Sequence, residues 1–304
     1  MKIIFIAISA CLILFTACNR KAMPSQTPLS NQLTKDSKGT PMLLGHCAAT
    51  SFRQAPFNKW YDSAYTAYQP QSSSVATLER ELANTTIEIF LGTWCGDSRR
   101  EVPRLLKTLS ESGLDTNNIH LILVDHEGSG YKQSPQHEEK GKYIFRVPTA
   151  IVYQNNKEVG RVIESPIQSW EQDLSNIATH QPYTPHYAAA DTWIHQVSKH
   201  SIGDEEMKNL VAAYQPKLSS SALLNNVGYL LLGQKQSRAA LQTFTFNTLL
   251  FPTDANVWDS LAEYYATIGN TSEALTYYKK VLSLKPGDAN ATAKIAELSK
   301  KGKG

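Results

Sequence analysis

Apolar residues in the first half of the chain gather in four short clusters that predict β-strands. Residues 86–91 (TIEIFL) and 119–124 (IHLILV) are near-continuous apolar runs, which are typical of strands covered on both faces. Residues 149–153 and 158–163 are shorter runs on either side of the turn-forming Asn155-Asn156-Lys157. This spacing predicts a hairpin.

Between and around these strands, apolar residues recur every three to four positions, the spacing of a helix. Residues 57–68 and 75–82 show it before the first strand, and residues 98–110 show it between the first two strands. Another helix is predicted at 167–177, after Pro166. The order strand, helix, strand, long loop, hairpin, helix predicts an α/β domain with a mixed sheet flanked by helices.

Beyond residue 177 the strand pattern ends, and Gln181-Pro182-Tyr183-Thr184-Pro185 predicts a linker. The rest of the chain is helical in pattern. Helices are expected at 192–197 and 204–214, where they would form a degenerate first repeat, and at 289–300, where the last helix would cover the final apolar face.

Within this helical part the chain repeats itself. Six positions are matched by residues of mostly similar type 34 positions later. Leu224, Val227, Gly228, Ala240, Phe244 and Pro252 correspond, in this order, to Trp258, Leu261, Ala262, Ala274, Tyr278 and Pro286. A period of this length, with small residues where two helices touch, resembles the tetratricopeptide repeat. The resemblance implies a curved array of helix pairs whose concave face binds a peptide or a partner domain. The alternative is that these helices pack on the α/β domain and only complete its surface.

The first residues have the composition of a targeting signal. Met1-Lys2 precedes an apolar run, Ile3–Phe15, which is too short for a membrane-spanning helix. The run ends at Phe15-Thr16-Ala17-Cys18, which resembles the lipobox of bacterial lipoproteins. The resemblance implies lipidation of Cys18 and attachment to a membrane, with the remainder of the chain outside the cytoplasm, in the periplasm or at the surface. Ordinary secretion and an uncleaved anchor helix are the alternatives.

Composition limits the remaining classes of function. The chain has 304 residues, 41% hydrophobic and 19% charged, with a net charge of +3, so nothing indicates binding to nucleic acid. Residues 19–38 are too polar to fold and are expected to form a tether. Of four cysteines, Cys11 leaves with the signal and Cys18 is expected to carry lipid. Cys47 and Cys95 are therefore the only thiols expected in the folded part.

Cys95 lies between a predicted strand and the helix that follows it. The strand ends near Leu91, and the helix begins near Cys95 or Ser98. A sulfur at a helix N-terminus lies beside free N–H groups and partial positive charge, which favour the thiolate. Trp94 offers an apolar wall for a substrate, whereas the carboxylate of Asp97 opposes the positive charge near the sulfur.

Residues 44–180 resemble the thioredoxin superfamily. The motifs that carry the resemblance are Trp94-Cys95-Gly96-Asp97-Ser98, Pro103 in the following helix, and Val147-Pro148-Thr149 before the hairpin. The resemblance implies that Pro148 is cis and lies against Cys95, where it presents backbone to a substrate chain. It also identifies Cys95 as the attacking thiol, with Trp94, Asp97, Ser98 and Pro148 around it.

Ser98 occupies the position of the family's second, resolving cysteine, so a mixed disulfide at Cys95 would have no local thiol to release it. Three alternatives remain open. An external thiol completes the reaction, Cys47 acts as the resolving cysteine, or Cys95 is a buried remnant and the domain only binds proteins.

No cofactor or metal is predicted. His126 and Glu127 are expected to be a solvated loop pair, and the run 137–140 (HEEK) is expected to lie on the surface. His46, next to Cys47, lacks a second pair of ligands at suitable spacing. Motifs for phosphate binding or for hydrolase chemistry are also absent from the sequence.

The sequence thus divides into a signal peptide (1–17), a flexible linker (18–43), a thioredoxin-like domain (44–180) and a helical repeat domain (187–302). The expected function is thiol-disulfide exchange or thiol capture on exported proteins or peptides through Cys95, with the repeats recruiting a client or partner. The alternative is a redox-inactive scaffold that only binds proteins.

Overall fold

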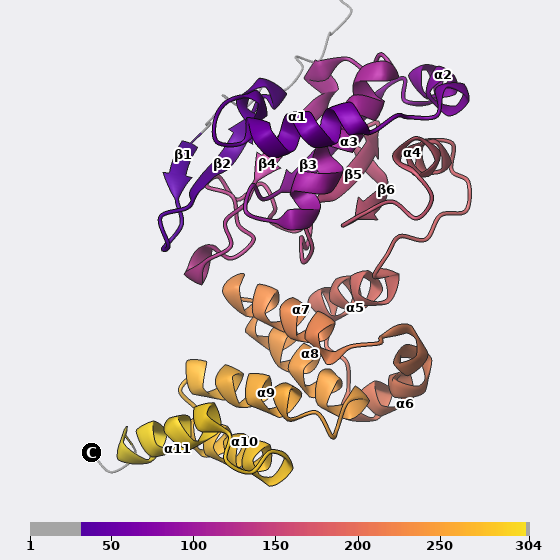
Figure 1. Cartoon of the computed structure of the whole chain (residues 1–304). Helices are drawn as coiled ribbons and strands as arrows, with labels where there is room; N and C mark the ends of the chain where they lie inside the picture. Colours follow the sequence, from indigo (N-terminus) through magenta and orange to yellow (C-terminus); the bar gives the residue numbers. More distant parts are fainter. Residues whose placement is uncertain (1–31, 302–304) are drawn as a thin grey trace, which may run out of the picture.

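The computed structural model describes residues 32–301, which form an α/β region (32–178) followed by an all-helical region (188–301; Figure 1). This order is the one predicted from the sequence. The signal peptide, Cys18 and most of the predicted tether lie outside the described residues. Within 32–301, every helix is too short or too polar to cross a membrane.

A six-stranded mixed sheet forms the centre of the α/β region, in the order β1-β2-β4-β3-β5-β6. Only β3 and β4 are parallel; the other neighbouring pairs are antiparallel. The strands are β1 (Gln32–Lys35), β2 (Pro41–Cys47), β3 (Thr85–Leu91), β4 (Ile119–Leu123), β5 (Thr149–Gln154) and β6 (Lys157–Ile163). The four predicted strands are confirmed as β3 to β6.

Residues 32–43 differ from the prediction, because they form β1 and the first three residues of β2 instead of a flexible linker. β1 pairs with β2 from Gln32 opposite Leu44 to Lys35 opposite Pro41. β1 is an edge strand whose pairing relies on backbone hydrogen bonds, and Leu33 in it remains 66% exposed. Such a strand needs few apolar residues, so its polar composition concealed it.

Four helices contribute to the core on one side of the sheet: α1 (Asn58–Ala67), α2 (Ser72–Glu81), α3 (Gly96–Glu111) and α4 (Trp170–Ala178). Their buried side chains join the odd-numbered positions of β3 and β4 in one cluster. All four were predicted, but α4 begins at Trp170 and not at Ile167. Ser169 caps the helix by accepting a hydrogen bond from the Gln172 amide, and the Asp173 carboxylate accepts one from the Ile167 amide.

The opposite side of the sheet is covered by the long segment between β4 and β5, here called the 124–148 loop. Its Ile144 and Val147 pack on Phe90, Ile122 and Ile151 of the strands. The run 137–140 in the same loop was expected to lie on the surface, but only His137 and Lys140 are exposed.

Two carboxylates of that run hold the loop in place. Glu139 is 2% exposed and accepts hydrogen bonds from the amide and the hydroxyl of Ser134. Glu138 forms an ion pair of 2.9 Å with His46 of β2. The loop is therefore fastened to β2 by buried polar contacts.

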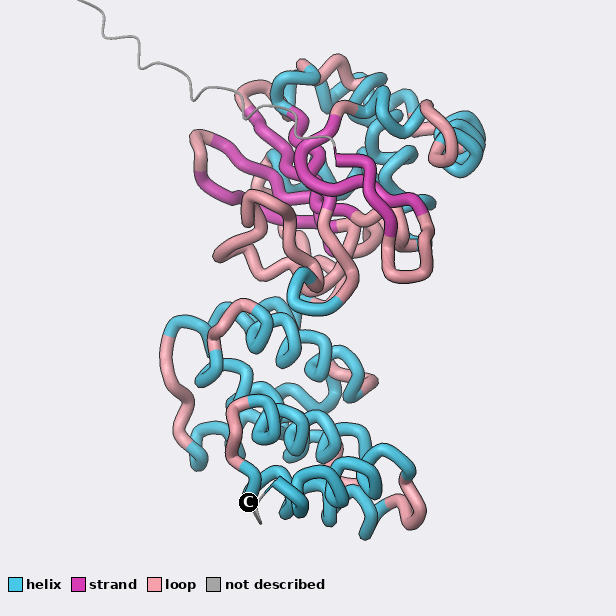
Figure 2. The backbone as a smooth tube through the Cα atoms, turned by 90° about the vertical axis from the view of Figure 1, so that its left-hand side faces the viewer, coloured by secondary structure: helices cyan, strands magenta, loops and turns pink. Residues whose placement is uncertain are grey.

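Seven helices follow in the helical region, and Figure 2 shows that no strand accompanies them in the described part. They are α5 (Ala188–Lys199), α6 (Asp204–Tyr214), α7 (Ser221–Gly233), α8 (Ser237–Leu250), α9 (Ala255–Thr267), α10 (Thr271–Leu284) and α11 (Ala289–Lys301). Ser220, Asp254 and Asn270 cap α7, α9 and α10 through side-chain oxygens. The predicted helices at 204–214 and 289–300 are confirmed, and that at 192–197 is longer than predicted.

The repeated positions lie where consecutive helices touch. Leu224, Ala240 and Phe244 are fully buried between α7 and α8, and Ala262 and Ala274 occupy the matching places between α9 and α10. A Cβ at Gly228 would lie only 2.5 Å from the Phe244 ring, so only glycine permits this approach. The two prolines of the pattern are exposed after their helices.

The two regions share a contact surface. Phe145 of the 124–148 loop and Ile163 of β6 belong to the same core cluster as the helical side chains. Arg161, which is 5% exposed, lies 3.4 Å from Asp191 of α5, and Tyr187 donates a hydrogen bond to Glu164. The helical region therefore packs against the segments that surround Val147 and Pro148.

Candidate functional site

Cys95 is the N-cap residue of α3. The chain leaves β3 at Leu91 and turns sharply, with the Cys95 amide donating to the Gly92 carbonyl at 3.0 Å. Gly92 is required there because a Cβ would lie 2.3 Å from the Trp94 indole. Cys95 itself has extended backbone angles (φ −84°, ψ 128°), which leave its side chain at the open end of the helix.

The thiol of Cys95 is partly buried and reaches the segment before β5. Its Sγ donates a hydrogen bond to the Val147 carbonyl at 3.3 Å. The Val147–Pro148 peptide bond is cis, as the resemblance implied, and Pro148 is buried. The structure thus brings Pro148 to Trp94 and Cys95, although it follows them by more than 50 positions in the sequence.

Ser98 and Asp97 occupy the first turn of α3. Ser98 is fully buried, and its hydroxyl accepts a hydrogen bond from the Gly92 amide at 3.3 Å. Asp97 is paired with Arg100 at 2.8 Å, so its negative charge is partly compensated. Ser98 therefore stabilises the turn and does not face a substrate.

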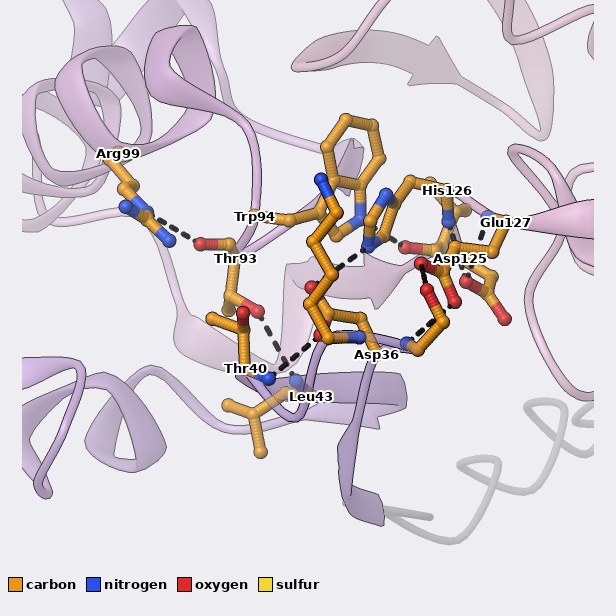
Figure 3. A network of polar contacts seen from close by, with 12 residues as sticks. Asp36, Thr40, Leu43, Thr93, Trp94, Arg99, Asp125, His126 and Glu127 are labelled. Atoms are coloured by element: carbon orange, nitrogen blue, oxygen red, sulfur yellow. Dashed lines mark hydrogen bonds and ion pairs between the residues drawn. The ribbon is translucent and has the colours of Figure 1, made fainter.

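Trp94 links this turn to the end of β4. Its indole N–H donates to the Val124 carbonyl at 2.9 Å, and its ring lies 4.9 Å from the His126 ring, with the two planes at 31° (Figure 3). Asp125 shapes the chain here by accepting hydrogen bonds from the amides of His126 and Glu127. His126, expected to be a solvated loop residue, is instead half-buried against Trp94.

The turn between β1 and β2 also reaches this loop. Asp36, His126 and Glu127 bring one potential metal-ligand atom each within 4.8 Å of one another. However, both carboxylate oxygens of Glu127 accept hydrogen bonds from Ser37, at 2.5 and 2.8 Å. We interpret this cluster as the contact that fastens the β1–β2 turn to the loop beside Trp94 (Figure 3).

Nothing in the sequence indicated that two further residues lie near Cys95. Lys132 and Tyr131 lie in the 124–148 loop, and both interact electrostatically with Cys95. The Lys132 ammonium lies 5.5 Å from the centre of the Trp94 ring and 5.0 Å from that of Tyr131. Burial lowers the pKa of Lys132 to about 8, and raises that of Tyr131. Only the folding of the loop brings them to the thiol.

Cys47 lies elsewhere. It is 5% exposed in β2 and packs in the cluster on the helix-covered side of the sheet, whereas Cys95 packs on the side covered by the loop. Both thiols are free. Burial raises the pKa of the Cys47 thiol to about 12. The sheet therefore separates Cys47 from Cys95 and does not bring them together as attacking and resolving thiols.

Cys47 also lines a separate cavity of about 490 Å³, between the ends of β2 and β4 and helices α1 and α3. Tyr61 and Leu106 contribute to its mostly apolar wall. Arg53 stands at this cavity with its guanidinium over the Tyr61 and Tyr65 rings and paired with Asp62.

No protein-family model matches the chain, and no curated protein of similar sequence was found. The function is therefore argued from the geometry around Cys95.

Proposed function

We propose that the chain is a thioredoxin-like protein of the cell envelope that acts on exported proteins or peptides by thiol-disulfide exchange at Cys95. The observation that carries the proposal is the position of Cys95: at the N-terminus of α3, partly buried, and 3.3 Å from the carbonyl that precedes cis-Pro148. A helix N-terminus favours a thiolate, which is the attacking species in this chemistry.

The proposed reaction proceeds through a mixed disulfide. The Cys95 thiolate attacks one sulfur of a client disulfide, forms a new S–S bond and releases the other client sulfur as a thiolate. A second, external thiolate then attacks the mixed disulfide and releases Cys95. The external thiol is needed because Ser98 has no sulfur and Cys47 lies behind the sheet.

A client would approach from the side on which the helical region lies. A cleft of about 580 Å³ separates Gly128 and Tyr131 of the 124–148 loop from Tyr229 of α7 and Thr267 of α9. Because Tyr131 also neighbours Cys95, a chain bound in this cleft would lie close to the thiol. We propose that the helices, which resemble tetratricopeptide repeats, recruit the client or a partner in this way.

The proposed location rests on the sequence of the first residues. A lipid on Cys18 would attach the protein to a membrane, and the polar residues up to β1 would act as a tether. Removal from the cytoplasm would place Cys95 among proteins that carry disulfides.

A turnover assay tests the function. A model protein with a glutathione mixed disulfide on one cysteine is incubated with the full chain and excess glutathione, and its deglutathionylation is followed by mass spectrometry. We expect catalysis by the wild type and by Cys47→Ser, and none by Cys95→Ser. Equal rates with and without the Cys95 thiol would leave only the redox-inactive, protein-binding scaffold.

A further inference from the structure

Lys132 is a buried lysine without a carboxylate partner. Its side chain enters the Cys95 site from the 124–148 loop and is only 5% exposed. Lysine is almost never buried to this extent unless it is paired with an opposite charge. Within residues 32–301, no carboxylate lies within ion-pair distance of its ammonium group. The ammonium group lies over the faces of Trp94 and Tyr131.

The charged groups that act electrostatically on Lys132 come from three segments. Cys95 lies at the start of α3, Arg146 lies in the same loop, and Glu164 follows β6; Tyr131 is the remaining titratable neighbour. Glu164 is already engaged, since it pairs with Arg146 at 3.5 Å and accepts a hydrogen bond from Tyr187. Of the two acidic groups that act on Lys132, this leaves the Cys95 thiol, once ionised, as the one whose charge Lys132 can balance.

We propose that Lys132 is the charge partner of Cys95: it favours loss of the proton that Sγ otherwise donates to the Val147 carbonyl, and so stabilises the thiolate. Lys132 acts as a positioning residue through its charge, and the two aromatic rings keep the ammonium out of water, where its attraction to a thiolate is stronger. This inference rests on the proposed function of Cys95, and it identifies what makes that thiol reactive.

Lys132 and Cys95 each affect the protonation of the other. Burial lowers the pKa of Lys132 to about 8, and the charge of Cys95 acts against that change by raising it. A thiolate that stabilises the ammonium is stabilised by it to the same extent, because linkage is reciprocal. With a pKa near 8, most of the lysine remains charged at neutral pH, so the partner charge is present where the reaction would occur.

The test measures the rate at which iodoacetamide alkylates Cys95 in the full chain at pH 7, in a Cys47→Ser background. Lys132→Met removes the charge, Lys132→Arg retains it, and Lys140→Met removes an exposed charge from the same loop as a matched control. We expect Lys132→Met to react about tenfold more slowly, and the other two to remain within about threefold of the parent.

Equal alkylation rates for Lys132→Met and its parent would overturn the inference. If Lys132→Met does not fold, the parent and the arginine variant decide the matter through the pH dependence of thiolate absorbance. An apparent pKa of Cys95 in both proteins at or above the value of about 8.5 for a free cysteine would then refute the pairing. Failure of the proposed function looks different: Cys95 would be readily alkylated in a lysine-dependent way, yet form no mixed disulfide.

Discussion

Replacing Lys132 by methionine is expected to make the folded protein more stable at neutral pH. Lysine at this position is 5% exposed and has no carboxylate partner among the described residues, so the folded state carries the cost of removing an ammonium group from water. Methionine has similar length and flexibility and carries no charge, and the rings of Trp94 and Tyr131 already offer it an apolar environment.

The magnitude follows from the pKa of Lys132, which burial lowers from 10.5 to about 8. Between these values the unfolded chain binds a proton that the folded chain does not, so the stability of the wild type rises with pH in this window. Below pH 8 the whole penalty is present, on the order of 3 kcal/mol; at pH 9.5 about 1 kcal/mol remains, and above pH 10.5 almost none. The gain from Lys132→Met should decrease in the same way.

Urea unfolding of the wild type and Lys132→Met, followed by tryptophan fluorescence at pH 7 and pH 9.5, measures this difference. The same pair in a Cys95→Ser background adds a second comparison, because a lysine without the thiolate should be still more costly. A Lys132→Met protein that is less stable than the wild type at pH 7, or a gain that does not change with pH, would refute the reasoning. Lower Cys95 reactivity together with higher stability is the combination that distinguishes a functional lysine from a structural one.

Three further results are expected. Iodoacetamide at pH 8 should modify Cys95 but not Cys47 in the folded protein, because burial raises the pKa of Cys47 to about 12; equal labelling before unfolding would contradict this burial. Gly228→Ala should destabilise the helical region by about 1–3 kcal/mol in thermal unfolding, since its Cβ would lie 2.5 Å from Phe244; an unchanged midpoint would show that the helices can separate at no cost. Ser98→Cys should supply a second thiol one turn from Cys95, so the mixed disulfide trapped by mass spectrometry should disappear in favour of an internal disulfide; persistence of the trapped species would mean that position 98 cannot reach the first sulfur.

The order of strands and helices was predictable because most elements bury a face. The apolar runs of β3 and β4 and the helical spacing of α3 follow directly from a sheet with a covered face. β1 was not predicted for the opposite reason: it is an exposed edge strand, so most of its side chains are polar. Its pairing with β2 depends on backbone groups that no composition reveals.

The site was predictable only in its local part. Trp94, Cys95 and Ser98 are neighbours in the chain, and a strand followed by a helix fixes their positions. Lys132 comes from a loop whose path depends on buried contacts such as that between Glu139 and Ser134. A sequence shows the residues of such a loop but not which of them is turned inward, so Lys132 looked like any solvent-exposed lysine.

The separation of Cys47 from Cys95 also required the structure. The sequence allowed the two remaining thiols to pair, but strand alternation places Cys47 on the helix-covered side of the sheet. Whether a cysteine faces one side or the other depends on the register of β2 with β4, and the short apolar stretch of β2 does not determine this register.

The central claim, that Cys95 exchanges disulfides without a partner thiol in the chain, is tested most directly by incubating the reduced protein with glutathione disulfide and measuring intact mass and peptides without reductant. The account predicts a single glutathione adduct on Cys95, no internal disulfide, and complete release of the adduct when a second thiol is added. No adduct on a Cys95 that iodoacetamide can still alkylate, or an internal disulfide between Cys95 and Cys47, would contradict it.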